Sequence, residues 1–254
     1  MRFQAYLKRR GRWREFLRLV GEQGLPYVLD TGPLDMSRSP IAVAVELEEP
    51  RPEALALPPV SFEELDWYII LADALDVKRL VLPPPPSLED IAKFYDGAVG
   101  YGVEINWIFG EPPMTRIRDV ETVARQVRTT AARIVYDPVK ARGTKEIYTD
   151  LVALSGYIRE IYLSNRWGER GARLPPFNPI GRINFVEILQ ALHLIQWEGR
   201  LTIRQAPQYF NELDLQLRIG AEVLDTARSI GVSKKVQKRV SIVIDELMAW
   251  RSDI

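Results

Sequence analysis

The sequence predicts an α/β fold, a single (β/α)8 barrel followed by an extra C-terminal helix. Short apolar runs rich in β-branched residues alternate along the chain with longer amphipathic segments of helical period. Several of the short runs are almost continuously apolar, as parallel strands covered by helices are. Eight such runs in 254 residues favour closure into a barrel over an open sheet.

The predicted strands are short and apolar, and a helix follows most of them. They cover residues 2–7, 26–30, 41–47, 78–82, 102–109, 133–137, 158–164 and 199–204. Two connections are longer than ordinary loops, residues 48–60 and 165–182. Both follow carboxyl ends of strands, where sites are built in this fold. No repeat or linker interrupts the pattern, so we expect one domain over residues 1–254.

The predicted helices have apolar residues on one face. They cover residues 11–22, 61–75, 87–97, 118–129, 145–154, 185–195, 212–230 and 234–250. Ser61 and Glu64 have the spacing of a capping box at the start of one of them. The last helix has a basic start and an apolar stripe. That stripe is expected either to cap the barrel or to form a dimer contact, and we favour capping.

The composition excludes several kinds of site. Without cysteine the chain has no disulfide, thiolate nucleophile, iron–sulfur cluster or cysteine zinc site. His193 is the only histidine, which excludes a metal site built on several imidazoles. No GxGxxG follows the first strand and no GxxxxGK[ST] occurs, so a nucleotide-binding loop is not predicted.

Composition also bears on location and partners. No segment reaches the length of about 18 apolar residues that a membrane helix needs, and the first residues lack the apolar core of a secretory signal. We therefore expect a cytoplasmic protein with no membrane partner. The lack of cysteine and the abundance of arginine and proline are typical of a thermophile.

Residues 162–204 have a pattern of glycine and apolar positions that points to one superfamily. The positions concerned are Gly181, Ile183, Phe185, Ile188, Leu189, Leu192, Gly199 and Leu201. The segment resembles the xylose-isomerase-like TIM barrels, which include the sugar-phosphate isomerases/epimerases and the AP endonucleases of the endonuclease IV type. Residues 132–141 and 66–84 resemble two further units of that superfamily. The order of units agrees along nearly the whole chain.

The resemblance implies a metal site at four strand ends, but most of its ligands are replaced here. The corresponding positions are Ile108, Lys140, Tyr162 and Arg204, and only Asp137 of the sixth-strand motif is kept. A divalent cation needs several donors and net negative charge, which one Asp beside Lys and Arg does not provide. We therefore expect no catalytic metal and no cofactor. A Lys or Arg side chain would occupy the cation's space beside Asp137.

Basic residues gather in the loops after the predicted strands, although the chain has 34 basic and 34 acidic residues. They are Lys8, Arg9, Arg10, Arg12, Arg38, Arg116, Lys140, Arg142, Arg166, Arg170, Arg173 and Arg204. The acids on that side are fewer: Asp30, Glu46, Glu48, Glu49, Glu111, Asp137 and Glu169. This face is expected either to bind an anion, such as a phosphosugar, a carboxylate or a nucleic-acid backbone, or to consist of solvated charges and internal ion pairs.

The candidate site residues follow from this arrangement. Asp137 and Lys140 are the candidates for acid–base catalysis, since burial near Arg204 would lower the pKa of Lys140. The candidates for ligand binding are Arg204, Arg142, Tyr162, Asn165, Arg166 and Asn106. Asp137 and Arg204 are equally compatible with a structural ion pair, and Tyr162 with packing.

Three functions are compatible with these residues. The first is a divergent sugar-phosphate isomerase/epimerase-like barrel that binds a small anionic sugar or acid without a catalytic metal. The second is a non-catalytic barrel, its pocket filled by Arg204 and Tyr162, whose basic face contacts nucleic acid or a protein partner. The third, which the sequence favours least, is a metal-dependent enzyme with a relocated metal site at Glu46, Glu111 and Asp137. Whether the protein is an enzyme, and its oligomeric state, are left open.

Overall fold

The structure is a computed structural model that describes residues 1–8, 13–22, 24–47, 51–127, 133–167 and 173–252. Its main sheet has the strand order β1-β10-β7-β6-β5-β4-β3-β2 of a closed barrel. The predicted (β/α)8 barrel with an extra C-terminal helix is therefore confirmed. The chain forms two compact units, Phe3–Tyr136 and, together with Met1–Arg2, Asp137–Ile254. A single domain stays a prediction.

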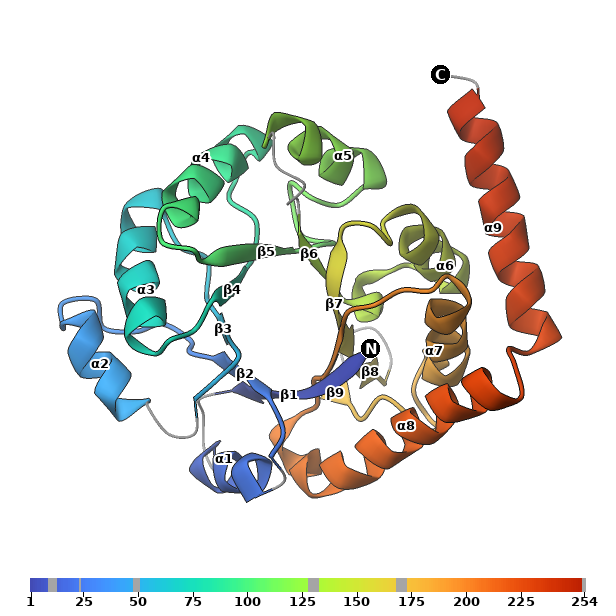
Figure 1. The fold of residues 1–254 in the computed structure, drawn as a ribbon, viewed down its shortest axis with the longest axis horizontal. Helices are drawn as coiled ribbons and strands as arrows, with labels where there is room; N and C mark the ends of the chain where they lie inside the picture. The colour runs from blue at the N-terminus through green and yellow to red at the C-terminus, as the bar shows by residue number, and fades with distance from the viewer. Residues whose placement is uncertain (9–12, 23, 48–50, 128–132, 168–172, 253–254) are drawn as a thin grey trace. The chain divides into compact units, whose positions relative to one another are not determined.

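The first unit alternates strands and helices. Its strands are β1 (Arg2–Lys8, of which Arg2 is counted with the second unit), β2 (Tyr27–Asp30), β3 (Ala54–Ala56), β4 (Arg79–Leu82), β5 (Glu104–Ile108) and β6 (Ile134–Tyr136). Its helices are α1 (Trp13–Glu22), α2 (Pro40–Glu46), α3 (Phe62–Ala74), α4 (Leu88–Val99) and α5 (Ile117–Gln126). Successive strands pair in parallel, with Leu55 opposite Leu80 and Leu80 opposite Ile105. Figure 1 shows α3 and α4 on the outer side of these strands.

The second unit contains the remaining elements. Its strands are β7 (Ile158–Leu163), β8 (Asn165–Arg166), β9 (Arg173–Leu174) and β10 (Arg200–Ile203). Its helices are η1 (Pro138–Lys140), α6 (Thr144–Ala153), α7 (Phe185–Leu194), η2 (Pro207–Glu212), α8 (Leu213–Ser229) and α9 (Lys234–Ser252). Strands β7 and β10 pair in parallel. The long connection after β7 contains the antiparallel pair of β8 and β9.

The prediction of a strand at residues 41–47 is wrong, because this segment forms helix α2. Pro40 lies in the first turn, where its missing N–H costs no hydrogen bond. Val43, Ala44 and Leu47 are buried at helical spacing, whereas Ile41 and Val45 are exposed. The third strand is β3, inside the predicted loop 48–60, where three small or apolar residues are buried and pair with β2. The run of β-branched residues suggested a strand, but its burial follows a helix.

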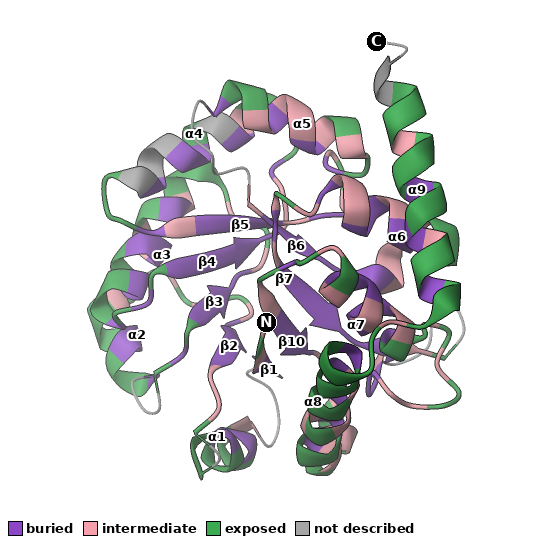
Figure 2. Cartoon of the chain, turned by 45° about the vertical axis from the view of Figure 1, so that its right-hand side comes forward, coloured by how far each residue is buried: buried purple, intermediate pink, exposed green. Residues whose placement is uncertain are grey.

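Local signals set the ends of other elements. Ser61 accepts a hydrogen bond from the Glu64 backbone N–H at 3.3 Å, and the Glu64 carboxylate accepts one from the Ser61 N–H at 2.7 Å. This confirms the capping box at the start of α3. Figure 2 shows the strands buried and the outer faces of the helices exposed. Among the described residues, no helix combines the length and apolar character needed to cross a bilayer.

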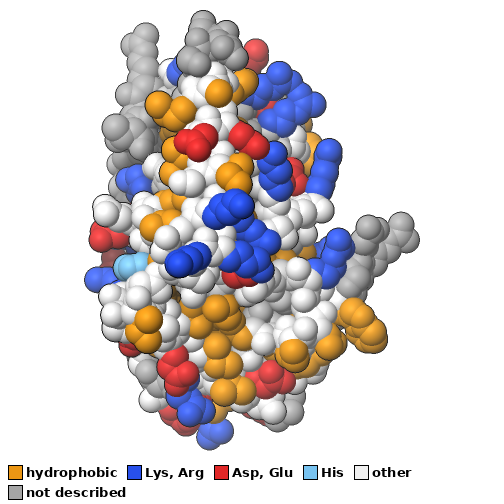
Figure 3. Space-filling model, turned by 90° about the vertical axis from the view of Figure 1, so that its right-hand side faces the viewer, with side chains coloured by type: hydrophobic (Ala, Val, Ile, Leu, Met, Phe, Trp, Pro, Cys, Tyr) orange, Lys and Arg blue, Asp and Glu red, His pale blue; other side chains and the backbone are white. Residues whose placement is uncertain are grey.

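Helix α9 packs within the second unit. Its Val236, Val240 and Val243 form a buried cluster with Tyr148 of α6 and Ala191 of α7. Two of the basic residues near its start pair with Glu187 of α7: Lys235 lies 2.6 Å from this carboxylate, and Arg239 contacts it as well. Lys and Arg side chains gather on the face viewed in Figure 3, with acidic groups among them. These contacts support the capping interpretation of the apolar stripe.

Candidate functional site

Asp137 follows β6 and is the central charged group of the second unit. Its side chain is fully buried, and Arg173 binds both carboxylate oxygens, with Nη2 2.6 Å from Oδ2 and Nη1 3.4 Å from Oδ1. Arg204, directly after β10, lies 3.7 Å from Oδ2. Oδ1 also accepts a hydrogen bond from the Val139 N–H at 3.3 Å, which caps η1. One carboxylate therefore joins three segments.

The two arginines have further contacts. Arg173 also donates a hydrogen bond to the Ser164 hydroxyl at the end of β7. The Arg204 guanidinium lies over the Tyr162 ring, 4.9 Å from its centroid, where the charge is attracted to the face of the ring. The side chains of Arg173 and Arg204 are about one-fifth exposed, 21% and 22%.

The charges around Asp137 keep it ionised. Burial by itself would raise the pKa of this carboxyl group. The positive charge and hydrogen bonds of Arg173, with the charges of Arg204 and Lys140, outweigh burial and hold the pKa below its usual value. Asp137 is therefore a weak base and a strong counter-charge to the cations around it.

The residues around Asp137 do not fit the metal site that the superfamily resemblance implies. The Asp137 oxygens already accept hydrogen bonds from Arg173 and Val139. The remaining side chains, Lys140, Arg204 and Tyr162, bring two cations to a position that needs anionic donors. Arg204 contacts both Asp137 and Tyr162, so its guanidinium lies where the ligands would have to converge.

The relocated metal site is likewise not supported. Glu46 forms an ion pair with Arg38 in the first unit, and Asp137 pairs with arginines in the second. No group of three or more His, Asp or Glu side chains suited to a metal ion is present in the described part of the chain.

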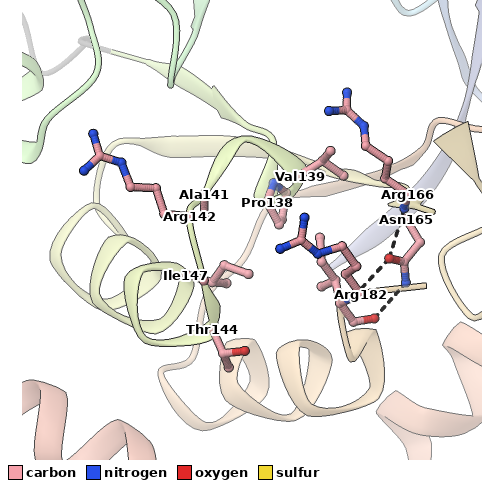
Figure 4. A pocket seen from close by; sticks show the side chains of 11 residues that line it. Pro138, Val139, Ala141, Arg142, Thr144, Ile147, Asn165, Arg166 and Arg182 are labelled. Carbon is pink, nitrogen blue, oxygen red and sulfur yellow. Dashed lines mark hydrogen bonds between the residues drawn. The ribbon is translucent and has the colours of Figure 1, made fainter. Parts of the chain in front are cut away.

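A cleft of about 380 Å³ lies beside η1 in the second unit. One wall consists of η1 and the first turn of α6, and the other contains Asn165, Arg166, Arg182 and Ile183. Figure 4 shows Arg182 extending from the second wall toward Pro138, with Ile147 and Thr144 on the opposite side. Arg142 and Arg166 extend outward from the two walls.

The cleft is strongly cationic. Arg142, Arg166 and Arg182 line it, and none of its described lining residues is Asp or Glu. The side chains of Arg142 and Arg182 form no ion pair or hydrogen bond within the described part of the chain. Gly143, which precedes α6, has no side chain to cap the helix, so the first N–H groups of α6 have no partner from a capping side chain. These groups add partial positive charge.

Asn165 shapes the second wall through bonds to the backbone. Its amide donates hydrogen bonds to the carbonyls of Pro176 and Ile183 and accepts them from the N–H groups of Ile183 and Arg166. The amide lies so close to Gly181 that an added Cβ would overlap it. The glycine of the superfamily pattern is therefore needed for this contact. Asn165 was predicted as a ligand contact, and its bonds here are to the chain itself.

The other predicted site residues are distributed among three places. Arg142, Asn165 and Arg166 line the cleft, whereas Arg204 and Tyr162 belong to the cluster around Asp137. Lys140 lies in η1 and contributes its charge to Asp137. Asn106 lies on β5 of the first unit, fully buried. Of the basic and acidic loop residues, Arg9, Arg10, Arg12, Arg170, Glu48, Glu49 and Glu169 lie outside the described residues.

Two arginines have larger roles than the sequence suggested. The sequence marks Arg173 only as one of the basic loop residues, yet it is the main partner of Asp137. Arg182 was the end of the long connection and not a candidate, yet it extends into the cleft. The signal that the sequence offers is its position directly after Gly181, a glycine of the superfamily pattern.

Solved structures with this fold are found at low sequence identity. A xylose isomerase domain protein from Planctomyces limnophilus has a TM-score of 0.68 at 10% identity, covering 89% of this chain and 96% of that one. An AP endonuclease of family 2 from Brucella melitensis has a TM-score of 0.59 at 14% sequence identity. The match covers 82% of this chain and 93% of that one. A xylose isomerase-like TIM barrel/4-hydroxyphenylpyruvate dioxygenase fusion protein has 0.64 at 13%, covering 92% of this chain and 45% of that one.

Comparisons by sequence identify no relative of this chain. No protein-family model matches the chain. No curated protein is significantly similar to it in sequence. The resemblance to xylose-isomerase-like TIM barrels is therefore confirmed at the level of the fold, and the activity of those proteins does not transfer with it.

Proposed function

From a xylose-isomerase-like barrel fold and the cationic cleft beside η1, we propose that the protein binds a small anionic sugar or acid. The observation that supports this proposal most directly is that two arginines of the cleft have no acidic partner in the described part of the chain. Arg142 and Arg182 line a cleft without acidic residues and form no ion pair within the described part of the chain. Guanidinium groups bind carboxylates and phosphates with paired hydrogen bonds, so such a cleft favours an anion.

The Asp137 cluster has a separate part in the proposal. Asp137 lies directly before η1, which forms one wall of the cleft, and Arg173 belongs to the connection that forms the other. Their ion pair joins the two walls. Any acid–base step would use Lys140, which lies in η1 and contributes its charge to Asp137. Catalysis without a metal remains part of the proposal.

One observation favours the second candidate, a barrel that binds a macromolecule through its basic face. Arg204 stacked on Tyr162 and paired with Asp137 occupies the position in which a substrate would meet Asp137. A nucleic-acid backbone would then contact the outward-pointing Arg142 and Arg166. Binding of this kind falls steeply with salt, which separates it from binding of a small anion inside the cleft.

The test is the thermal stability of the full chain with a panel of ribose 5-phosphate, ribonate, ribose, divalent metals and a short single-stranded oligonucleotide. We expect a rise in Tm with the anionic sugars and none with ribose, because a ligand bound only to the folded state stabilises it. Arg182→Gln should remove the rise. Arg218→Gln, which changes an exposed i,i+4 pair on α8, should keep it.

The panel also decides between the candidates. An oligonucleotide response without a sugar-anion response would replace the small-ligand proposal with the macromolecular one. A metal response lost in Asp137→Ala would contradict our conclusion that the residues around Asp137 do not fit a metal.

A further inference from the structure

We propose that the cleft beside η1 binds a monocarboxylic acid with an apolar body, its carboxylate on Arg182 and its body between η1 and Ile183. This inference rests on the proposed function and narrows its ligand class. It selects an acid over a sugar, and a ligand with one negative charge over a ligand with several.

The guanidinium group of Arg182 faces the interior of the cleft. Figure 4 shows Arg182 extending from the second wall toward Pro138, whereas Arg142 and Arg166 extend outward. Arg182 forms no ion pair or hydrogen bond within the described part of the chain. A guanidinium group pairs with a carboxylate through two parallel hydrogen bonds. The interior of the cleft therefore matches a single carboxylate group.

Most of the other side chains that line the cleft are apolar. They are Pro138, Val139, Ala141, Ile147 and Ile183. The first four belong to the wall of η1 and α6, and Ile183 belongs to the opposite wall. An apolar body gains free energy when it leaves water for such a surface. A body covered with hydroxyl groups would instead give up hydrogen bonds to water.

The neutral polar side chains of the cleft offer little to a sugar. Among the described lining residues they are Thr144 and Asn165. The Asn165 amide is fully buried and donates hydrogen bonds to the carbonyls of Pro176 and Ile183, at 3.1 and 2.8 Å. Its oxygen accepts hydrogen bonds from the N–H groups of Arg166 and Ile183, at 3.1 and 3.0 Å. These bonds use both hydrogens and both lone pairs of the amide, so Asn165 has none left for a ligand hydroxyl.

The start of α6 already has a carboxylate of its own. Glu146 accepts a hydrogen bond from the Arg142 N–H, directly before this helix. The carboxylate of the ligand is therefore assigned to Arg182 and not to the helix. Because like charges repel, Glu146 also disfavours a ligand with a second negative charge at this end of the cleft. A monocarboxylate avoids this repulsion and still satisfies Arg182.

The experiment is calorimetric titration of the full chain with phenylacetate, phenylacetamide and ribonate at neutral pH. Phenylacetate and ribonate have the same charge and differ in the body, whereas phenylacetamide keeps the apolar body and lacks the charge. We expect phenylacetate to bind about tenfold more tightly than ribonate, because only its body gains from the apolar walls. Phenylacetamide should bind at least about tenfold more weakly than phenylacetate, because it cannot form an ion pair with Arg182.

Variants on the second wall test the location. Arg182→Gln should weaken the binding of phenylacetate about tenfold or more. Ile183→Thr should weaken it about threefold or more and change the binding of ribonate less than about twofold, because only an apolar body gains from this side chain. Ile180→Thr, at an exposed isoleucine of the same connection outside the described lining, should change neither. Ile183→Thr keeps the backbone groups that bond to Asn165, and circular dichroism checks that each variant folds.

Different outcomes separate this inference from the proposed function. If ribonate binds as tightly as phenylacetate, or if Ile183→Thr weakens both acids equally, the apolar acid is the wrong ligand class while the anion-binding function stands. If phenylacetamide binds as tightly as phenylacetate, the assignment of a carboxylate to Arg182 is wrong. If phenylacetate, ribonate and ribose 5-phosphate all fail to bind, the proposed function itself fails.

Discussion

Asp137 and Arg173 account for much of the organisation of the candidate site. A buried carboxylate is costly unless it is paired and hydrogen-bonded, and here Arg173 binds both oxygens while Arg204 and the Val139 N–H add further contacts. The ion pair with Arg173 also limits the chemistry that Asp137 can perform. Its oxygens are no longer available to a divalent cation, and the carboxylate stays ionised, so Asp137 acts mainly as a counter-charge to the residues around it.

For this single residue, we expect Asp137→Asn to lower the free energy of unfolding by about 3 kcal/mol, because the substitution leaves two partly buried arginines without their counter-charge. Urea unfolding measures the change. Asp214→Asn, which removes an exposed pair with Arg218, serves as the control and should cost less than about 1 kcal/mol. A loss as small as the control's would show that the cluster contributes little.

The same residue predicts a pH dependence. The folded-state pKa of Asp137 is lowered, so its contribution to stability is fully present above the unfolded value of about 3.9 and is lost as pH falls through the folded value. The stability difference between the native chain and Asp137→Asn should therefore stay constant from neutral pH to about pH 5 and shrink in stronger acid. A difference that grows in acid would contradict the lowered pKa.

At the scale of elements, the connection between β7 and α7 builds one wall of the cleft. Asn165 holds this connection through backbone bonds on both sides of Gly181, and Arg173 of β9 ties it to Asp137. Arg166 and Arg182 take their positions from these contacts. The wall therefore depends on tertiary hydrogen bonds more than on regular secondary structure.

Gly181→Ala is expected to disturb this wall, since the new Cβ would overlap the Asn165 amide. We expect a loss of about 1–3 kcal/mol in stability, as for other overpacked sites, together with weaker binding of phenylacetate. Gly156→Ala is the matched control, because a Cβ there meets nothing within 4 Å and the backbone is not left-handed. Unfolding by urea and the calorimetric affinity give the two readouts, and unchanged values for both would contradict the role of Asn165.

At the scale of the whole molecule, the strand order is that of one closed barrel, while the contacts divide into two compact units. The predicted single domain requires the two to unfold together. Each unit has a buried tryptophan, Trp107 in the first and Trp197 in the second. Helix α9 belongs to the core of the second unit through Val240.

We therefore predict one cooperative unfolding transition, with tryptophan fluorescence and circular dichroism coinciding. Val240→Ala should lower the free energy of unfolding by about 1–3 kcal/mol and shift the whole transition. Ile242→Ala, at a side chain on the same helix that is 45% exposed, should have little effect. Two separate transitions, only one of them shifted by Val240→Ala, would show two domains instead.

The barrel is predictable from the sequence, because strand–helix alternation and apolar periodicity are local patterns that survive at 10% identity to a solved barrel. It also located the charged residues of both clusters, except that Arg182 was not a candidate and Arg173 was not distinguished from its neighbours. It misplaced the third strand, because an apolar β-branched run has no local sign of which side is buried. Which arginines pair with Asp137 and which face an open cleft follows from the folded chain alone, because charge pairing depends on distances between segments far apart in the sequence.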